Sequence, residues 1–462
     1  MRDRMKTWRE RGIEVVVIGN GNATFARDFR EEFALEGLLL VDPELVAYRA
    51  AGLRRGRVEI ASPRMFGNAI RALRTGARQT GVQGDPWQLG GVVVLAAGGE
   101  LRFVHRSREA GDHADPEAIE AALAEDAPTI EETVRPPSPL APAARALRPL
   151  LDASPRFSFD RIGFQRHALG FDPEDLEVDL YGRRCLVTGA SAGLGYETAL
   201  ALADLGGEVV LLCRDRARGE AAVTAIREAT GSRRVRLCEV DLADLDSVAR
   251  AGDALGREPV DVLVHNAGLL PDARIESPQG LELTFATHVA GPHGLTRVLR
   301  PALEQAGDAR VVWVSSGGML TRRLNLEDPQ WRWRDYDGVV AYAETKRAQV
   351  VLAELWAEAF ADTKVCVNAM HPGWADTKGV RESLPRFHRV TETILRTPAE
   401  GADTIVWLAA SPAAAGRTGR FFFDREPVRT HWVAGTRESE SDRRALWTLC
   451  ESIWEEARGG HE

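Results

Sequence analysis

The chain of 462 residues is 44% hydrophobic and 27% charged, and its formal net charge is −9. This length exceeds one ordinary domain, and the composition is typical of a globular protein. The acidic balance and the lack of any Lys/Arg run argue against a nucleic-acid partner. No apolar run is long enough to span a membrane, and the first residues do not form a signal peptide. We therefore expect a cytoplasmic protein without a membrane partner.

The cysteines lack the spacing of metal sites or redox pairs. Three of them fall inside expected strands, where cysteine usually acts as a small buried hydrophobe. We therefore expect neither a disulfide nor a bound metal. The five positions are Cys185, Cys213, Cys238, Cys366 and Cys450.

The first third of the chain carries the signals of a small α/β domain. Strand patterns precede and follow a helix in which phenylalanines recur every four residues, and a Gly-Gly turn joins a later pair of strands. A further helix begins near a proline. The expected strands cover 13–19, 38–43 and the hairpin 90–105, and the helices cover 23–33 and 115–125.

Three motifs in this region are informative, namely Val41-Asp42-Pro43, the run from Gln83 to Gly91, and Gly111-Asp112-His113. With the strand order they resemble the peroxiredoxin-like antioxidant proteins of thioredoxin fold, over about residues 5 to 125. The family's reactive thiol would precede the first helix, but no cysteine occurs before Cys185. Without a thiolate, thiol peroxidase activity is excluded. A degenerate structural or dimerisation domain, a gene start that omits the opening strands of the fold, and a live binding role stay open.

Residues 127–156 are rich in proline and alanine, a composition that favours an extended linker over a packed core. We therefore divide the chain into a first domain (1–126), this linker (127–156), a larger domain (157–440) and a C-terminal helix or tail (441–462).

A strand, a glycine-rich turn and a helix follow one another over 186–205. Glycines allow a tight turn and let a pyrophosphate approach the N-terminus of the helix, where free N–H groups favour negative charge. The glycine spacing fits the general dinucleotide fingerprint only loosely, so a plain strand-to-helix turn is the alternative. The residues expected to bind the nucleotide are Thr188, Gly189, Ser191, Gly193, Leu194 and Gly195.

After this turn strands alternate with helices, which predicts an α/β fold with a doubly wound parallel (Rossmann) sheet. Asp241 and Leu242 end the third strand, where they can reach an adenine. Asn266-Ala267-Gly268 follows the fourth strand, and its small side chains allow the cofactor to approach closely.

Arg214 follows the second strand, which is expected over 208–213. In a dinucleotide site an acidic residue at this point binds the ribose 2′-hydroxyl, whereas an arginine accommodates a 2′-phosphate. We therefore expect NADP rather than NAD as the cofactor. A solvated arginine at the end of a strand is the alternative.

Two serines, Ser315 and Ser316, end the fifth strand, at the edge where open α/β sheets place their ligands. Tyr342 and Lys346 follow on one face of a helix. An ammonium beside a phenol lowers the pKa of the phenol, so we expect Tyr342 to act as a general acid/base.

The glycine turn, Asn-Ala-Gly, Ser-Ser and Tyr-x-x-x-Lys occur in the order of the short-chain dehydrogenase/reductase superfamily, which the chain resembles over about 180 to 425. The resemblance implies hydride transfer between NADP(H) and a small-molecule carbonyl or alcohol. By this resemblance Tyr342 transfers the hydroxyl proton, Ser316 binds the substrate oxygen, and Lys346 also holds the nicotinamide ribose. The residues that it places at the nicotinamide amide are Pro372, Gly373 and Thr377.

Further motifs resemble an orphan branch of that superfamily, dehydrogenase/reductase member twelve, whose substrate they do not disclose. These motifs lie at 314–320, 346–352, 371–377, 401–404 and 419–425.

The chain departs from the superfamily at His288, where an asparagine usually holds a proton-relay water. A histidine can also bond water and titrates near neutral pH, so a catalytic relay role and a packing role are both open. The segment before Tyr342 is also long, and its aromatics Trp331, Trp333 and Tyr336 could line an apolar pocket or cap the sheet.

Beyond the last strand, Trp374 is our candidate for a substrate wall, and 379–389 is the expected lid. The rival to an enzyme is a cofactor-binding pseudoenzyme that senses redox state or acts as a scaffold. A homo-oligomer is possible in either case.

Overall fold

A computed structural model describes residues 2–19, 26–27, 30, 38–42, 47–48, 51, 53, 90–97, 100–107, 114–124, 158–376, 388–389, 391–433 and 435–459. The chain divides into two units, 1–134 and 135–462, which are described one at a time. The boundary falls inside the predicted linker, although the linker itself lies outside the described residues, as does most of the helix predicted over 23–33.

The first unit has the predicted α/β character. β1 pairs with β2 in parallel, and β3 with β4 forms the predicted antiparallel hairpin. A small core of Trp8, Val94 and Ile119 packs the first and last helices of this unit against the hairpin. The short helix at the start of the chain was not predicted. The described elements are α1 (Arg2–Glu10), β1 (Val16–Gly19), β2 (Leu38–Val41), β3 (Gly91–Leu95), β4 (Leu101–Arg106) and α5 (Pro116–Ala122).

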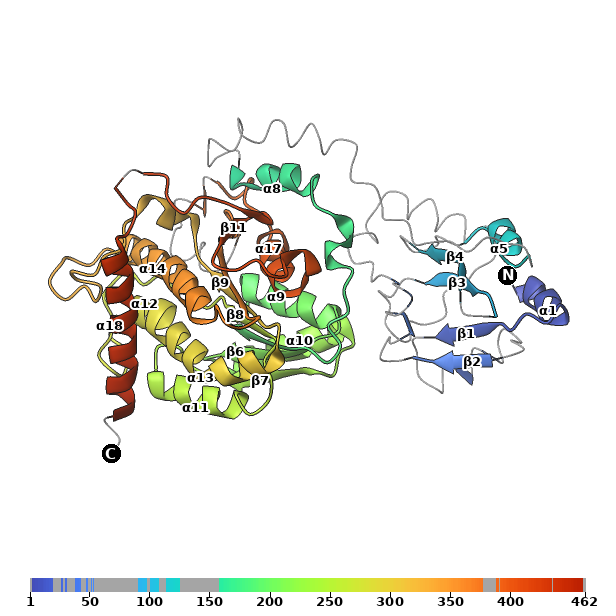
Figure 1. Ribbon diagram of the computed structural model, residues 1–462, viewed down its shortest axis with the longest axis horizontal. Helices are drawn as coiled ribbons and strands as arrows, with labels where there is room; N and C mark the ends of the chain where they lie inside the picture. The colour runs from blue at the N-terminus through green and yellow to red at the C-terminus, as the bar shows by residue number, and fades with distance from the viewer. Residues whose placement is uncertain are drawn as a thin grey trace. The chain divides into compact units, whose positions relative to one another are not determined.

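The second unit is built on an eight-stranded sheet in the order β12-β11-β10-β9-β8-β5-β6-β7, and only β12 runs antiparallel to its neighbour (Figure 1). Its central strands are continuous apolar runs because helices cover both faces of the sheet. The strands are β5 (Arg184–Thr188), β6 (Glu208–Cys213), β7 (Val235–Glu239), β8 (Val262–His265), β9 (Arg310–Val314), β10 (Cys366–Met370), β11 (Phe421–Phe423) and β12 (Glu426–Pro427).

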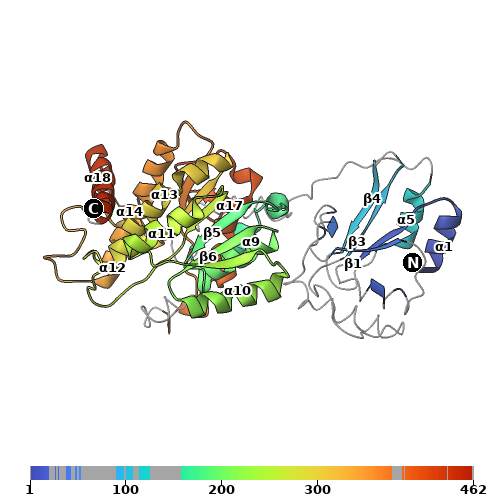
Figure 2. The ribbon, with the colours of Figure 1, turned by 90° about the horizontal axis from the view of Figure 1, so that it is seen from below.

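Two hydrophobic cores lie on the two faces of this sheet. One contains buried residues of α9, α10 and α17, and the other contains residues of α11, α13 and α14. Figure 2 shows α9 and α10 beside β5 and β6. The longer helices are α9 (Gly193–Asp204), α10 (Arg216–Thr230), α11 (Leu245–Leu255), α13 (Gly291–Ala306), α14 (Gly338–Ala359) and α17 (Pro398–Ala410). The shorter ones are α12 (Leu283–Phe285), η3 (Ala286–Ala290), η4 (Gly317–Thr321) and η5 (Pro412–Ala414).

The C-terminal helix α18 (Glu440–Gly459) packs on the outer side of α13 and α14. Its Trp454 lies against Gly294, where a Cβ would stand 2.3 Å from the indole ring. Glu451 accepts a hydrogen bond from the His293 ring at 2.8 Å, and Arg443 pairs with Glu354 on α14. The stretch predicted as a C-terminal helix or tail is therefore part of the core that contains α11, α13 and α14.

The second unit begins upstream of its sheet with α8 (Arg161–Ala168) and η2 (Pro173–Leu176). We call residues 158–176 the entry segment. The buried side chain of Arg396 holds its start, because the guanidinium donates to the carbonyls of Ser158 and Phe159 at 2.8 and 2.9 Å. Asp424 accepts two hydrogen bonds from the same guanidinium at 2.6 and 2.8 Å and pairs with the His167 ring at 2.6 Å.

These contacts predict how far the chain can be truncated at its N-terminal end before the second unit loses stability. A chain that begins at Ser154 keeps the entry segment and should fold by itself. A chain that begins at Val178 loses Phe159 and the carbonyls that Arg396 bonds, and should be less stable by roughly 3 kcal/mol or more. Urea unfolding of the two proteins tests this, and equal midpoints would show that the entry segment adds no stability.

In the part of the chain that the structure describes, no helix is both long and apolar enough to cross a bilayer. Among those same residues, no group of three or more His, Cys, Asp or Glu side chains is placed to hold a metal ion.

Candidate active site

The order of the strands reverses between β5 and β8, and open α/β sheets bind their ligands at such a switch point. The glycine turn starts there, directly after Thr188. The Thr188 hydroxyl donates to Val264 O at 3.1 Å and accepts from the N–H groups of Asn266 and Ala267 at 2.9 and 3.0 Å. The Asn266 amide donates to the carbonyls of Thr188 and Gly189 at 3.0 and 3.3 Å. Hydrogen bonds of Thr188, Asn266 and Ala267 therefore fix the conformation of the turn.

The turn fits an anion because the N-terminus of α9 has no side-chain cap. Ala192 precedes the helix in an extended conformation and caps none of the first N–H groups. Gly193 has φ +59°, and a Cβ on Gly195 would stand 2.4 Å from the Asn266 amide nitrogen. Uncapped N–H groups over a turn this closely packed are suited to a pyrophosphate.

The other residues predicted in this turn take different positions. Ser191 hydrogen-bonds to the Cys213 thiol at the end of β6. Leu194 packs against α17, where a Cβ on Gly401 would stand 2.6 Å from the Leu194 Cδ2 atom.

Arg214 leaves the end of β6 with 64% of its side chain exposed, and its guanidinium lies 3.9 Å from the Asp241 carboxylate. The neighbouring Asp215 caps α10 by accepting a hydrogen bond from Arg218 N at 3.0 Å. The negative charge of Asp215 is therefore turned to the helix, and Arg214 stays available to an anion. Leu242 is buried, and its carbonyl lies against α13.

Ser316 and Tyr342 meet at the carboxyl edge of the sheet. Ser316 follows β9 and Tyr342 lies in the first turns of α14, and the Ser316 side chain lies close enough to the phenol to lower its pKa. Burial raises the pKa of Tyr342 to about 12, against the lowering effect of Ser316. The prediction that Lys346 lowers the pKa of Tyr342 is therefore wrong, because burial of the phenol raises this pKa.

Lys346 forms its hydrogen bonds with groups other than the phenol. Its buried Nζ donates to Val314 O at 2.8 Å and to the Gln349 side-chain oxygen at 3.0 Å, and it lies 5.4 Å from the centre of the Tyr342 ring. Burial lowers the pKa of Lys346 to about 7. Spacing on one helix face brings the two side chains near each other but does not fix their hydrogen bonds.

His288 is fully buried, and both of its ring nitrogens are occupied by protein groups. Nε2 accepts from Leu269 N at 3.0 Å, and Nδ1 bonds to the Thr345 hydroxyl at 2.9 Å. That hydroxyl donates to Tyr342 O at 2.9 Å, so the ring is neutral with its proton on Nδ1. Burial also holds the pKa of His288 well below its usual value. Of the two predicted roles, the structure favours packing and positioning over a ring-bound relay water.

Gly268 lies between these groups. A Cβ at this position would stand 3.2 Å from His288 Nε2 and 3.8 Å from Lys346 Nζ. The Asn-Ala-Gly turn thus contacts both the glycine turn and the side chain of Lys346 on α14.

Two of the three aromatics of the long segment contact charged side chains. Trp331 is buried under the Arg334 guanidinium, 3.7 Å from the ring centre. The Tyr336 hydroxyl donates to the Glu282 carboxylate at 3.0 Å, and Trp333 is 73% exposed.

Phe159, which the sequence did not single out, lies beside the start of η4, directly after the catalytic serine. Its ring packs on Gly317, where a Cβ would stand 2.7 Å away, and its centre is 6.0 Å from that of Trp374. The Phe159 carbonyl also accepts from Trp374 N at 2.8 Å. Phe159 was missed because residues 157–177 follow no clean periodicity. With half-buried Trp374 it forms an aromatic wall beside Gly317, the residue that follows Ser316.

The turn after β10 is held by the same contacts. Gly373 has φ +72°, and a Cβ there would stand 2.5 Å from Arg396 Nε, while Pro372 O accepts from that guanidinium at 3.4 Å. Thr377 lies outside the described residues, as does the predicted lid except for positions 388 and 389.

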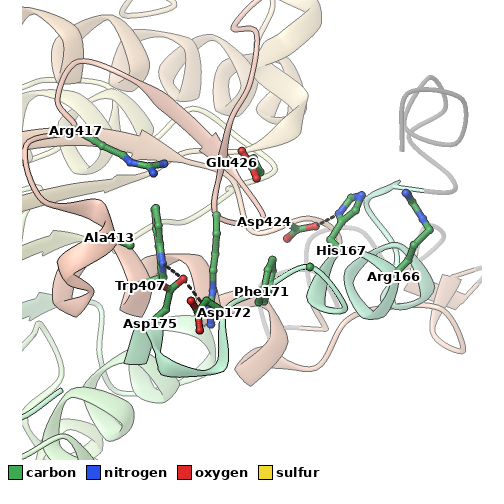
Figure 3. A pocket seen from close by; sticks show the side chains of 12 residues that line it. Arg166, His167, Phe171, Asp172, Asp175, Trp407, Ala413, Arg417, Asp424 and Glu426 are labelled. Atoms are coloured by element: carbon green, nitrogen blue, oxygen red, sulfur yellow. Dashed lines mark hydrogen bonds and ion pairs between the residues drawn. The ribbon is translucent and has the colours of Figure 1, made fainter. Parts of the chain in front are cut away.

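A separate cavity of about 210 Å³ lies between α8 and the segment around β12 (Figure 3). Its charged groups pair with one another or with their neighbours. Asp175 accepts from the Trp407 indole at 2.8 Å, and Arg425 pairs with Asp403 at 2.7 Å. None of the predicted catalytic or cofactor residues lines this cavity, so we assign it a structural role.

Comparison with known proteins agrees with this geometry. Residues 183–386 match the family model "short chain dehydrogenase", and residues 1–109 match "AhpC/TSA antioxidant enzyme". Over 298 residues the chain is 42% identical to Bos taurus "Dehydrogenase/reductase SDR family member 12", covering 64% of this chain and 93% of that protein. Over 324 residues it is 33% identical to Mus musculus "Retinol dehydrogenase 14", covering 65% and 92%.

A solved structure of an uncharacterised protein from Mycobacterium paratuberculosis aligns with a TM-score of 0.50 and 28% identity, covering 60% of this chain and 95% of the other. The predicted Rossmann fold, the similarity to the member-twelve branch and the fused antioxidant-type unit are thereby confirmed.

Proposed function

This chain belongs to the short-chain dehydrogenase/reductase family and is an oxidoreductase, and we propose that it transfers a hydride between NADP(H) and a carbonyl or alcohol of an apolar small molecule. The observation that carries the proposal is that Ser316, Tyr342 and buried Lys346 come together at the switch-point edge of the sheet, with Lys346 Nζ 5.4 Å from the centre of the Tyr342 ring. This complete set also argues against a pseudoenzyme.

The glycine turn and Lys346 would hold a nicotinamide cofactor, which would supply the hydride in the direction of reduction. The Ser316 hydroxyl holds the carbonyl oxygen, and the Tyr342 hydroxyl donates its proton to the same oxygen as negative charge develops there. With its pKa near 12, Tyr342 is protonated at neutral pH and ready to act as the acid. Oxidation of the alcohol runs through the same groups in reverse.

An apolar substrate is supported by the aromatic wall of Phe159 and Trp374 beside Gly317. The mouse relative at 33% identity is named for retinol, which is an apolar alcohol. Turnover of NADPH with a panel of apolar aldehydes, ketones and quinones tests this proposal. Activity confined to sugars or other polar carbonyls would contradict the substrate class.

Arg214 supports NADP as the cofactor, and Arg214→Asp should remove most of the preference for NADPH. A guanidinium offers planar donors to the 2′-phosphate, and such bonds contribute about 1.5–3 kcal/mol each. The variant should therefore bind NADPH roughly ten- to a hundred-fold more weakly, while its affinity for NADH changes little. Direct titration with both cofactors at one ionic strength measures this.

Arg216→Asp is the matched control, because it makes the same charge change at the first residue of α10. It should leave the preference for NADPH in place. Equal affinity of the unchanged protein for NADPH and NADH would refute the assignment.

A further inference from the structure

The main-chain carbonyl of His288 lacks its ordinary helical donor. In an α-helix this carbonyl would accept from the N–H of residue 292, but Pro292 has none. The backbone here forms the π-helical turn η3, in which Gly291 N bonds to Ala286 O. The carbonyl takes its hydrogen bond from another helix, since the Gln349 amide nitrogen donates to it at 2.9 Å.

The same Gln349 side chain also holds the catalytic lysine. It lies three residues after Lys346 on α14, so both project from one side of the helix. Its amide oxygen accepts from Lys346 Nζ at 3.0 Å, and its exposed fraction is 0%. One buried amide therefore joins the ammonium group to the His288 carbonyl.

Lys346 Nζ has a second hydrogen-bond partner besides Gln349. Val314 O from β9 accepts the second hydrogen bond, at 2.8 Å, and a third N–H is left for a bound ribose. The titratable groups that face the amine are Tyr342 on α14 and the neutral His288 ring on η3. Since burial is the cause that lowers the pKa of Lys346, the uncharged Gln349 oxygen is one of the two groups that stabilise the ammonium.

We propose that Gln349 is a positioning residue for the reaction, whose amide fixes Lys346 Nζ between Val314 O and the His288 carbonyl in the place of a bridging water. This inference rests on the proposed function, because it assigns Lys346 to the ribose and to Tyr342. An amide does not exchange protons as water does. The connection from Lys346 to the His288 carbonyl is therefore a brace, and no proton passes along it to Tyr342.

The first test follows Lys346 without any cofactor. The sequence contains four lysines, at 6, 346, 364 and 378, so the Lys346 side-chain carbon signals can be assigned by NMR with the Lys346→Met variant. Gln349→Leu removes the acceptor and should lower the titration midpoint of Lys346 by roughly one pH unit. Gln349→Glu keeps the size, adds a charge, and should raise the midpoint by a similar amount.

Val351→Ala is the control for packing. Val351 is fully buried on α14 and has no hydrogen bond to the lysine, so its truncation should leave the midpoint unchanged. Where Gln349→Leu does not fold, Gln349→Asn serves in its place, because the shorter amide cannot span both partners and should also lower the midpoint.

The second test follows the alkaline limb of kcat, where activity falls as Lys346 loses its proton. The limb should move to lower pH in Gln349→Leu and to higher pH in Gln349→Glu, and kcat at pH 7 should fall about tenfold in Gln349→Leu. The inference would be overturned if, in both Gln349 variants, the Lys346 titration midpoint and the alkaline limb of kcat stayed within about 0.3 pH unit of the unchanged protein.

The two proposals fail in different ways. The unchanged protein could turn over no carbonyl or alcohol while the Lys346 midpoint moves as expected in the variants. This result would refute the proposed function and support the positioning role of Gln349. Ordinary turnover with unmoved midpoints would refute the brace alone.

Discussion

Replacing Tyr342 with phenylalanine should lower kcat by roughly 10²- to 10⁴-fold while leaving the affinity for the cofactor nearly unchanged. The substitution removes the proton donor that lies beside Ser316 and very little packing. Steady-state kinetics on the best substrate of the carbonyl panel, together with titration of NADPH into the variant, measures both quantities.

Tyr336→Phe provides a matched control. It removes the same atom from a tyrosine that bonds to Glu282 and Thr284 and lies outside the Ser–Tyr–Lys set. Its kcat should stay close to that of the unchanged protein. Near-full reductase activity in Tyr342→Phe would contradict the proposed role of the phenol.

Asp424→Ala should lower the free energy of unfolding by roughly 3–5 kcal/mol, because it leaves a buried charge without its partner. Arg396 and Asp424 have side chains only 1% and 2% exposed, and the guanidinium also bonds to carbonyls of the entry segment. Guanidinium chloride unfolding at pH 7 measures the loss.

Asp308→Ala is the surface counterpart, since this carboxylate pairs with Arg183 but is 51% exposed. Its substitution should cost less than about 1 kcal/mol. Equal losses in the two variants would show that the buried pair contributes no more than a surface pair.

The buried Arg396–Asp424 pair also determines how the free energy of unfolding changes with pH. Burial alone would raise the pKa of Asp424, but Arg396 and the His167 contact outweigh it, so the pKa lies below its usual value. The stabilisation is therefore complete above the pKa of an unfolded aspartate and is lost as pH falls through the lowered value. Asp424→Ala should show less acid destabilisation than the unchanged protein.

Much of the catalytic unit could be predicted because its determinants are local. Strands such as β5 and β6 are short apolar runs that parallel sheets require, and Gly189 and Gly193 have the positive φ that the turn demands. Ser316 and Tyr342 could be placed because strand ends meet at one edge of a parallel sheet.

The remainder depends on contacts between distant residues. Phe159 is tied to Arg396 and Trp374, more than two hundred positions along the chain, and no periodicity in its own segment signals this. The Gln349 amide has a function only because Pro292 frees a carbonyl on another helix. The pKa of Tyr342 was predicted wrongly because it depends on how deeply the fold buries the phenol, which spacing along one helix does not show.

The position of α18 bears on how the chain can associate with itself. Trp454 on Gly294, the Glu451–His293 bond and the Arg443–Glu354 pair cover the outer side of α13 and α14 with the chain's own C-terminal helix. Apolar area that could have drawn two copies together at this helix pair is instead buried within one copy. A homo-oligomer of this protein must therefore assemble through a different surface, or first displace α18.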